Sequence, residues 1–118
     1  MNIEEFREYC LSKKGSGESF PFDEQALVFK VMNKMFAITG LEHHPPVVNL
    51  KCDPERSAAL RDEYDGKIYG AFHMNKLHWN SILIEAVPAE LTRELIDHSY
   101  ELVVNKLTKK ARAELDNS

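Results

Sequence analysis

The sequence predicts an α+β fold, in which an antiparallel β-sheet carries helices packed mainly on one of its faces. Three observations predict it. Segments with helical spacing of apolar residues occur at both ends of the chain and once near its middle. The segments between them are rich in β-branched and aromatic residues. The length of 118 residues and the 43% hydrophobic content suit a single compact domain over residues 1–118.

The first helix is expected over residues 2–14. Asn2 and Glu5 have the spacing of a capping box, in which each side chain accepts a hydrogen bond from the other residue's backbone N–H. Apolar residues then recur at helical steps, and charged residues occupy the other faces. Gly15 follows two lysines and is expected to end the helix, because glycine is common just past a helix C-terminus.

Strands follow the first helix after a flexible Gly-Ser-Gly connector. A short edge strand is expected over residues 18–22, where Pro21 restricts pairing to one side. Residues 27–32 and 35–39 are rich in β-formers. The two-residue loop Asn33-Lys34 between them suits a tight turn, because asparagine tolerates positive φ. These segments predict an antiparallel hairpin.

The next part of the chain is expected to contain a strand and a helix. Residues 40–46 form a loop, and residues 47–52 form the strand. Asp53 then occupies the N-cap position of a helix and Pro54 its first turn, which are the places where these two residue types are favoured. The helix is expected to run to about Tyr64.

The second half of the sequence predicts two more extended segments and two helices. Residues 67–72 and 79–85 are expected to be extended, and a turn at 73–77 joins them. Apolar residues on both faces of the second segment indicate an interior strand. Residues 89–107 have a broad apolar face and predict a helix about 28 Å long, enough to cross the sheet. A short helix over 109–115 follows.

The charge balance opposes a general role in binding polyanions. Nineteen acidic and fifteen basic residues give a net charge of −4, whereas affinity for phosphates needs a basic face. The charge is uneven, however, because one acid-free segment near the C-terminus carries four cations: Lys106, Lys109, Lys110 and Arg112. This cluster suits a solvated helix end, or it contributes to a local phosphate-contacting face.

The two cysteines and the N-terminal segment indicate a cytoplasmic protein. Cys10 and Cys52 lie beside apolar neighbours in no metal-like spacing, and we expect buried thiols in a reducing compartment. The N-terminal segment is acidic and amphipathic, unlike a signal peptide. No apolar run approaches the roughly 20 residues of a membrane span. We therefore expect a soluble chain without a membrane partner.

One stretch in mid-chain differs from the rest: His73-Met74-Asn75-Lys76-Leu77-His78-Trp79-Asn80-Ser81-Ile82. It holds the only tryptophan and two of the five histidines. No acidic residue occurs between Lys67 and Ile84, although the chain as a whole is acidic. A polar, aromatic and acid-free stretch of this kind indicates either a recognition surface or an unusual turn.

Three parts of the chain resemble the MmcQ/YjbR family. They are the first helix with Phe20-Pro21-Phe22 and the hairpin, the stretch from His73 to Ile82, and residues 96–103 with the basic segment after them. The resemblance runs from end to end. It implies a domain similar to the CyaY (frataxin-like) fold. It also implies a DNA-binding role, assigned by analogy because the family's sheet resembles the double-wing DNA-binding domain of a phage transcription factor.

The leading functional hypothesis is a non-enzymatic protein that binds double-stranded DNA through the sheet and the loop of residues 73–80. Asparagine amides suit base edges, lysines can meet phosphates, and the tryptophan could stack on a base or sugar. The candidate contact residues are His73, Asn75, Lys76, His78, Trp79, Asn80, Lys30 and Lys34.

A structural role for the same loop remains open. Asn75 and His73 could hold an unusual turn while Trp79 anchors the core. The protein would then be a protein-interaction or small-ligand adaptor, which the negative net charge favours. No Gly-rich phosphate loop, metal-ligand spacing or nucleophile motif occurs, so we expect no cofactor, metal or catalytic residue. We expect a monomer or a weak dimer.

Overall fold

The computed structural model describes residues 1–118 and contains one sheet of six strands. The strands are β1 (Ser16–Ser19), β2 (Ala26–Val31), β3 (Lys34–Gly40), β4 (Val47–Lys51), β5 (Ile68–Gly70) and β6 (Trp79–Leu83). Their order across the sheet is β1-β2-β3-β4-β6-β5, and every neighbouring pair is antiparallel. β6 therefore lies inside the sheet, as its apolar residues on both faces predict.

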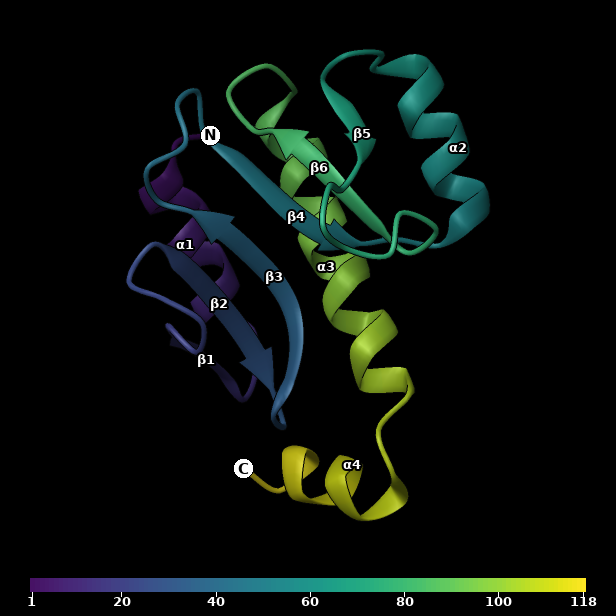
Figure 1. Ribbon diagram of the computed structural model, residues 1–118. Helices are drawn as coiled ribbons and strands as arrows, with labels where there is room; N and C mark the ends of the chain where they lie inside the picture. Colours follow the sequence, from purple (N-terminus) through teal and green to yellow (C-terminus); the bar gives the residue numbers. More distant parts are fainter.

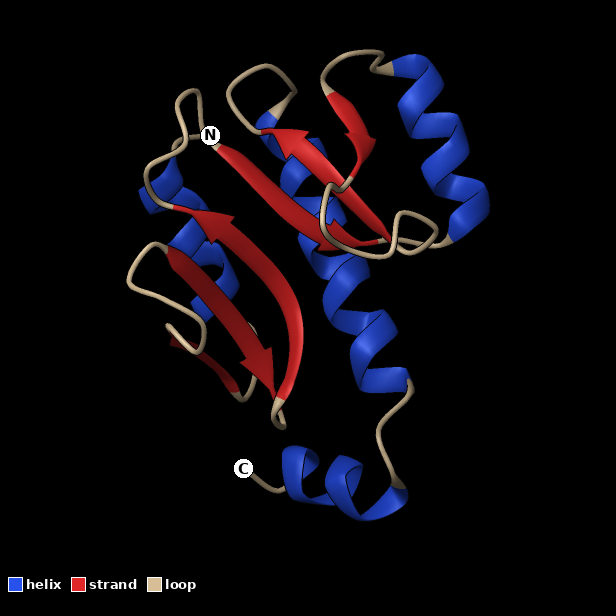
Figure 2. Cartoon of the chain, viewed as in Figure 1, coloured by secondary structure: helices blue, strands red, loops and turns tan.

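Four helices complete the fold: α1 (Ile3–Leu11), α2 (Pro54–Glu63), α3 (Ala89–Asn105) and α4 (Lys109–Asp116). In Figure 1, α1 and α3 lie behind the sheet, and α3 packs across β2, β3 and β4. α2 lies beside β5, and α4 lies at the opposite end of the molecule, below the β2–β3 hairpin (Figure 2). The predicted α+β class, with an antiparallel sheet and helices mainly on one face, is confirmed.

Three of the four helices begin at a capping side chain. Both bonds of the capping box at α1 are present, from the Glu5 N–H to Asn2 Oδ1 at 2.8 Å and from the Asn2 N–H to Glu5 Oε1 at 3.1 Å. The Asp53 carboxylate accepts the Arg56 N–H at 3.2 Å at the start of α2. Thr108 caps α4 in the same way. These bonds satisfy backbone donors that the first helical turn leaves free.

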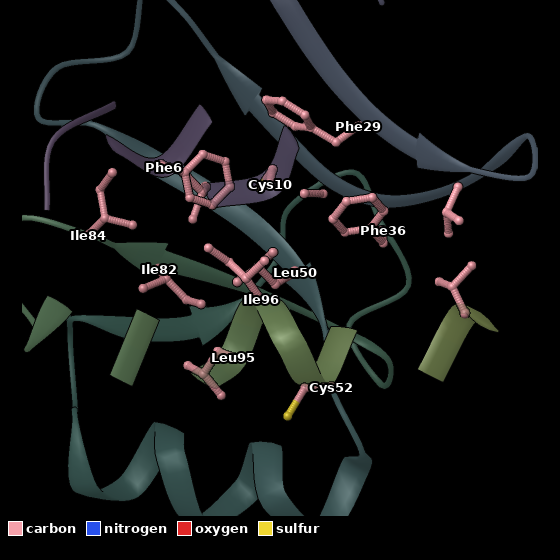
Figure 3. Close-up of a cluster of buried hydrophobic side chains, with 14 of the residues drawn as sticks. Phe6, Cys10, Phe29, Phe36, Leu50, Cys52, Ile82, Ile84, Leu95 and Ile96 are labelled. Carbon is pink, nitrogen blue, oxygen red and sulfur yellow. The ribbon is translucent and has the colours of Figure 1, made fainter. Parts of the chain in front are cut away.

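The hydrophobic core lies between the sheet and the helices α1 and α3 (Figure 3). Phe6 of α1 meets Phe29 of β2 edge to face, with ring centroids 5.8 Å apart. Phe36 of β3 meets Tyr100 of α3 in the same geometry at 5.5 Å. Burying one phenylalanine side chain stabilises a fold by about 1.5–3 kcal/mol, so these pairs hold both helices on the sheet.

The two cysteines are free and buried, as their apolar neighbours predict. Burial raises the pKa of the Cys10 and Cys52 thiols. A raised pKa keeps a thiol protonated near neutral pH and makes it a poor nucleophile. No helix combines the length and the apolar character that crossing a bilayer requires.

The first strand and the end of α1 differ from the sequence-based expectation. The helix ends at Leu11, and Gly15 turns the chain with a φ of 70° directly into β1, which starts at Ser16. β1 ends at Ser19, before the proline that was expected to lie within it. Gly15 itself is held by a tertiary contact, because a Cβ at this position would lie 2.5 Å from Leu115 Cδ1 of α4.

The hairpin turn lies one residue earlier than expected. Met32 and Asn33 form the turn with φ values of 47° and 65°, and Lys34 already belongs to β3. Two consecutive positive φ angles are typical of the type I′ turn that matches the twist of a hairpin. A bulge at Phe29/Lys30 shifts the register by one residue, which the sequence pattern does not reveal.

Candidate functional site

Arg61 of α2 holds the loop between β5 and β6 by hydrogen bonds. The Arg61 Nε donates to the Asn80 Oδ1 at 2.8 Å, and its Nη2 donates to the carbonyl oxygen of Lys76. The Asn80 Nδ2 in turn donates to the Ser57 Oγ at 3.0 Å. Asn80 is 1% exposed, so its amide is used inside the protein and supports the loop.

Asn75 closes the turn within this loop. Its Oδ1 accepts the Leu77 N–H at 3.0 Å, and its carbonyl oxygen accepts the N–H groups of His78 and Trp79 at 3.0 and 2.9 Å. This is an Asx-type turn, in which a short side chain replaces a backbone partner. The Asn75 amide nitrogen is left free to face solvent or a ligand.

His73 and Gly70 allow the tight path at the other end of the loop. His73 has a φ of 64°, a left-handed conformation that few non-glycine residues adopt. A Cβ on Gly70 would lie 3.3 Å from the Lys76 Cβ and 3.5 Å from the Arg61 Nη1, so glycine leaves room for the loop to fold back on α2.

The loop ends at Trp79, which pairs with Lys51 where β4 ends. Trp79 is 7% exposed, and the Lys51 Nζ lies 5.8 Å from the centroid of its ring. A cation–π contact at this distance holds the ammonium group over the indole. Because the ring is nearly buried and Lys51 lies over it, Trp79 serves as a wall of the site and positions the lysine.

Ser99 of α3 bridges β3 and β4 beside Lys51. Direct pairing of β3 with β4 stops at Ala37 and Leu50. One residue further, the Ser99 Oγ donates to the Phe36 carbonyl oxygen at 2.6 Å and accepts the Lys51 N–H at 2.9 Å. The buried hydroxyl therefore bridges the two strands where they part, and α3 runs on past the end of β4 (Figure 1).

A cavity of about 410 Å³ lies at this point. Its walls come from the end of β4, the start of α2, the β5–β6 loop and the C-terminal part of α3. The lining residues are Lys51, Asp53, Pro54, Asn75, His78, Trp79, Leu102 and Lys106. A second cavity of about 240 Å³ shares Lys51 and Lys106 with the first and adds Lys34, Val103 and Leu107.

Three lysines dominate the electrostatics of these cavities. Lys34, Lys51 and Lys106 take part in none of the ion pairs of the structure. Burial lowers the pKa of Lys51, and the positive charges of Lys106 and Lys34 lower it further. Asp53 is the single carboxylate in either lining, and its oxygen is engaged at the N-terminus of α2. The two linings together therefore carry a positive formal charge.

His98 stabilises the edge of the site that Asp53 forms. Its Nε2 accepts the backbone N–H of Asp53 at 3.1 Å, which requires that this nitrogen carry no proton. Burial, and then the nearby Arg56 guanidinium, lower the pKa of His98. The neutral imidazole thus links α3 to the start of α2.

The structure brings together four of the eight candidate residues and separates the others. Asn75, His78 and Trp79 line the larger cavity, and Lys34 lines the smaller one. Four candidates lie outside both cavities: His73, Lys76, Asn80 and Lys30. The Lys76 Nζ lies over the Phe72 ring, 4.9 Å from its centroid, on the exposed side of the loop.

Lys51 and the role of Asp53 are missing from the sequence-based set. Lys51 sits at the end of a strand among apolar residues, and nothing in its sequence neighbours indicates that Lys34 and Lys106 lie near it. Lys106 is recognisable only as part of a basic segment. Its partners in that segment, Lys109, Lys110 and Arg112, line neither cavity.

The open face of the sheet is polar but carries little charge. Ile38, Asn49, Ser81 and Tyr69 lie side by side across β3, β4, β6 and β5. The Ser81 Oγ donates to the Asn49 Oδ1 at 2.6 Å. Neither this row nor the rest of the fold brings three or more His, Cys, Asp or Glu side chains together as metal ligands.

Comparisons of the sequence with a family model and with curated proteins agree on one family. The YjbR family model matches residues 11–102. The "Uncharacterized protein YjbR" of Escherichia coli K12 is 32% identical over 113 residues, which cover 95% of each chain. The "Uncharacterized protein YbdF" of Escherichia coli O157:H7 is 37% identical over 92 residues, which cover 77% of this chain and 75% of that protein.

Two crystal structures share the fold. Deinococcus radiodurans protein DR2400, with the domain DUF419, is 40% identical and superimposes with a TM-score of 0.91 over 98% of this chain and 88% of that chain. A protein from Pseudomonas syringae is 28% identical, with a TM-score of 0.73 over 86% of this chain and 98% of that one. The whole arrangement of sheet and helices therefore recurs in solved relatives.

Proposed function

The chain belongs to the YjbR family, and from this premise we propose that it is a cytoplasmic, non-enzymatic protein that binds DNA through the lysines around Trp79. The contact surface that we propose consists of Lys34, Lys51 and Lys106 together with the exposed side of the β5–β6 loop, including Lys76 and His78. We call it the lysine surface.

The convergence of Lys34, Lys51 and Lys106 without a salt-bridge partner carries this proposal. Bringing three ammonium groups together is unfavourable unless an anion compensates the charge. The lowered pKa of Lys51 reflects this repulsion in part. Phosphate groups of a nucleic acid supply the matching charge at regular spacing.

The β5–β6 loop supports this surface in two ways. Its buried side, tied to Arg61 through Asn80 and the carbonyl of Lys76, fixes its shape. Its outer side presents the exposed Lys76, and the partly exposed His78 lines the larger cavity together with Lys51 and Lys106. Preorganised contacts of this kind avoid the entropy cost of ordering a loop on binding.

The test is fluorescence anisotropy of a labelled DNA duplex titrated with the protein at low and moderate salt. If three phosphates are neutralised, a fourfold rise in salt, from about 50 to 200 mM, should weaken binding by about 40-fold. Absence of binding at the lower salt concentration would contradict the proposal.

The Lys106→Ala variant should weaken DNA binding and lower the magnitude of the salt slope by about 1, as expected for the loss of one phosphate contact. The matched control is Lys67→Ala, which removes the same charge from an exposed residue outside both cavities. If both variants lose affinity equally, only net charge matters and the lysine surface is not the contact site.

A second candidate function is a protein-interaction adaptor, and an apolar groove favours it. A hollow of about 270 Å³ between α1 and β2 is lined mainly by hydrophobic residues, among them the exposed Phe20 and Leu41. Exposed apolar grooves often mark binding sites for other molecules. If Phe20→Ser abolishes capture of a protein partner while DNA fails to bind, this second function replaces the first.

A further inference from the structure

The larger cavity beside Trp79 has a shape that distinguishes between kinds of nucleic-acid phosphate. Its volume of about 410 Å³ lies within the range of small-molecule sites, about 300–1,000 Å³. Trp79, 7% exposed, forms one wall, and Lys51 is only partly exposed. A duplex is a wide convex cylinder with its phosphates on the outside, so it can cover this cavity but cannot enter it.

Resting on the proposed nucleic-acid function, we propose that this cavity receives a phosphate monoester, the terminal phosphate of a nucleic-acid strand or of a free nucleotide, held by Lys51 and Lys106. A terminal phosphate projects from the end of its strand, whereas an internal phosphodiester is flanked by sugars on both sides. The cavity can thus take in a terminal phosphate, whereas the internal phosphates of a strand can contact the same lysines only from outside it.

The charge of the lining fits this group better than it fits a diester. A phosphate monoester carries between −1.5 and −2 charges near neutral pH, whereas each internal phosphate carries one. Lys51 and Lys106 face the larger cavity, and Lys34 lies beside both in the adjoining one. Three lysines and the single carboxylate, Asp53, leave a formal charge of about +2, which matches the monoester better than the single charge of a diester.

Two further hydrogen-bonding side chains complete the lining. The Asn75 amide nitrogen makes no hydrogen bond within the protein, since only its Oδ1 is engaged, by the Leu77 N–H. The His78 ring also faces the cavity. Lys51 is already positioned by Trp79, so it loses little freedom when it binds an anion.

Asp53 makes the assignment testable by gain of affinity. Its carboxylate lines the cavity and also caps α2. Asparagine caps helices as well as aspartate does, so Asp53→Asn removes the negative charge and keeps the cap. Removal of one nearby like charge should tighten binding of a phosphate monoester by about three- to fivefold.

The experiment compares a short single-stranded oligonucleotide that ends in a 5′-phosphate with the same strand ending in a 5′-hydroxyl, with the fluorescent label at the opposite end. A 3′-phosphorylated strand is compared in the same way. Calorimetric titrations of the protein with a free nucleoside monophosphate and with the corresponding nucleoside complete the experiment. We expect the phosphorylated strand to bind about tenfold more tightly.

Variants assign the preference to the cavity. Lys51→Met and Lys106→Met should abolish the preference for the phosphorylated end, whereas Lys67→Met should retain it. Methionine removes the positive charge and keeps an unbranched aliphatic side chain of similar length. Asp53→Asn should increase the preference, and circular dichroism should show an unchanged fold. An Asp53→Asn variant that folds but binds no more tightly would overturn the assignment.

The outcomes separate this inference from the proposed function. Equal binding of phosphorylated and hydroxyl-terminated strands would overturn the inference and leave DNA binding intact. Binding of the nucleoside monophosphate but of no oligonucleotide and no duplex would support the phosphate monoester site and contradict the nucleic-acid function. Absence of binding by every probe in this experiment would overturn the inference, and absence of duplex binding as well would overturn both.

Discussion

Ser99 shows how one buried hydroxyl can position a binding site. It joins the Phe36 carbonyl and the Lys51 N–H across the gap between β3 and β4, where direct strand pairing has stopped. Without this bridge two buried backbone groups would lack partners, which is costly in a protein interior. The position of Lys51 at the cavity therefore depends on a residue of α3 that touches no ligand.

Ser99→Ala should lower the free energy of unfolding by about 2 kcal/mol, because the Lys51 N–H and the Phe36 carbonyl both lose their partner. Urea denaturation followed by circular dichroism measures this change. The control is Ser12→Ala, which removes an exposed hydroxyl that only bonds the Tyr9 carbonyl and should cost less than about 0.5 kcal/mol. Equal effects of the two substitutions would show that the bridge does not stabilise the fold.

His98 gives the fold a pH dependence with a definite sign. Its pKa is lowered from the ordinary value of 6.5, first by burial and then by Arg56, against the opposing effects of Asp53, Glu101 and Glu94. The unfolded chain therefore binds a proton more readily than the folded one. The stability that neutral His98 contributes is fully present above pH 6.5 and is lost as the pH falls from there through the lower folded pKa.

The His98→Gln variant tests this dependence, because glutamine can accept the Asp53 N–H but does not titrate. The wild type should lose stability relative to the variant as the pH falls below about 6.5. The measurement is the urea midpoint of both proteins at a series of pH values. Parallel curves would show that His98 does not titrate differently in the folded state.

At the scale of elements, the contact between α4 and the α1–β1 turn fixes the C-terminal end of the chain. Leu115 is buried and lies against Gly15, which has a φ of 70°. An apolar side chain distant in sequence requires the turn to have no Cβ.

Gly15→Ala should destabilise the protein by about 2 kcal/mol, because the new side chain forces alanine into a left-handed φ and also displaces Leu115. Gly66→Ala is the matched control. Gly66 has a φ of 79°, and no atom lies within 4 Å of the place that an alanine Cβ would occupy, so only the backbone strain of about 1 kcal/mol remains. A Gly15→Ala effect no larger than that of Gly66→Ala would contradict the packing role.

Element identities follow from local sequence, whereas the ends of elements depend on tertiary contacts. The capping box at Asn2 and the Asp53-Pro54 start of α2 are local signals, and both are confirmed. The close approach of Leu115 to Gly15 and the bulge beside Phe29, which shifts the register of the hairpin, appear only in the folded chain. No local pattern carries that information.

At the scale of the whole molecule, the sequence predicts only part of the site, because local sequence does not show which distant residues meet in the fold. The stretch around Trp79 stands out in the sequence through its composition, and Asn75, His78 and Trp79 do line the cavity. Lys51 and Lys106 are separated by 55 positions and reach the cavity from a strand and a helix. Their convergence is a property of the topology, because β4 and α3 become neighbours only in the folded chain.

The distribution of elements around the cavity links ligand binding to global stability. β4, α2, the β5–β6 loop and α3 all contribute to its lining, so unfolding of any of these elements destroys the site. A ligand that binds only the folded state stabilises it by mass action, by about 2.7 kcal/mol at a concentration of a hundred times its Kd.

The DNA duplex used for anisotropy, at that concentration, should therefore raise the urea midpoint of unfolding by about 1–2 M. Trp79 is the only tryptophan, so its fluorescence reports both unfolding and events at the site. The doubly substituted Lys51→Met, Lys106→Met protein should show a much smaller shift of the midpoint with DNA, because it retains Lys34 but lacks two of the three lysines that we propose bind phosphate. A shift of equal size in that variant would locate DNA binding elsewhere on the molecule.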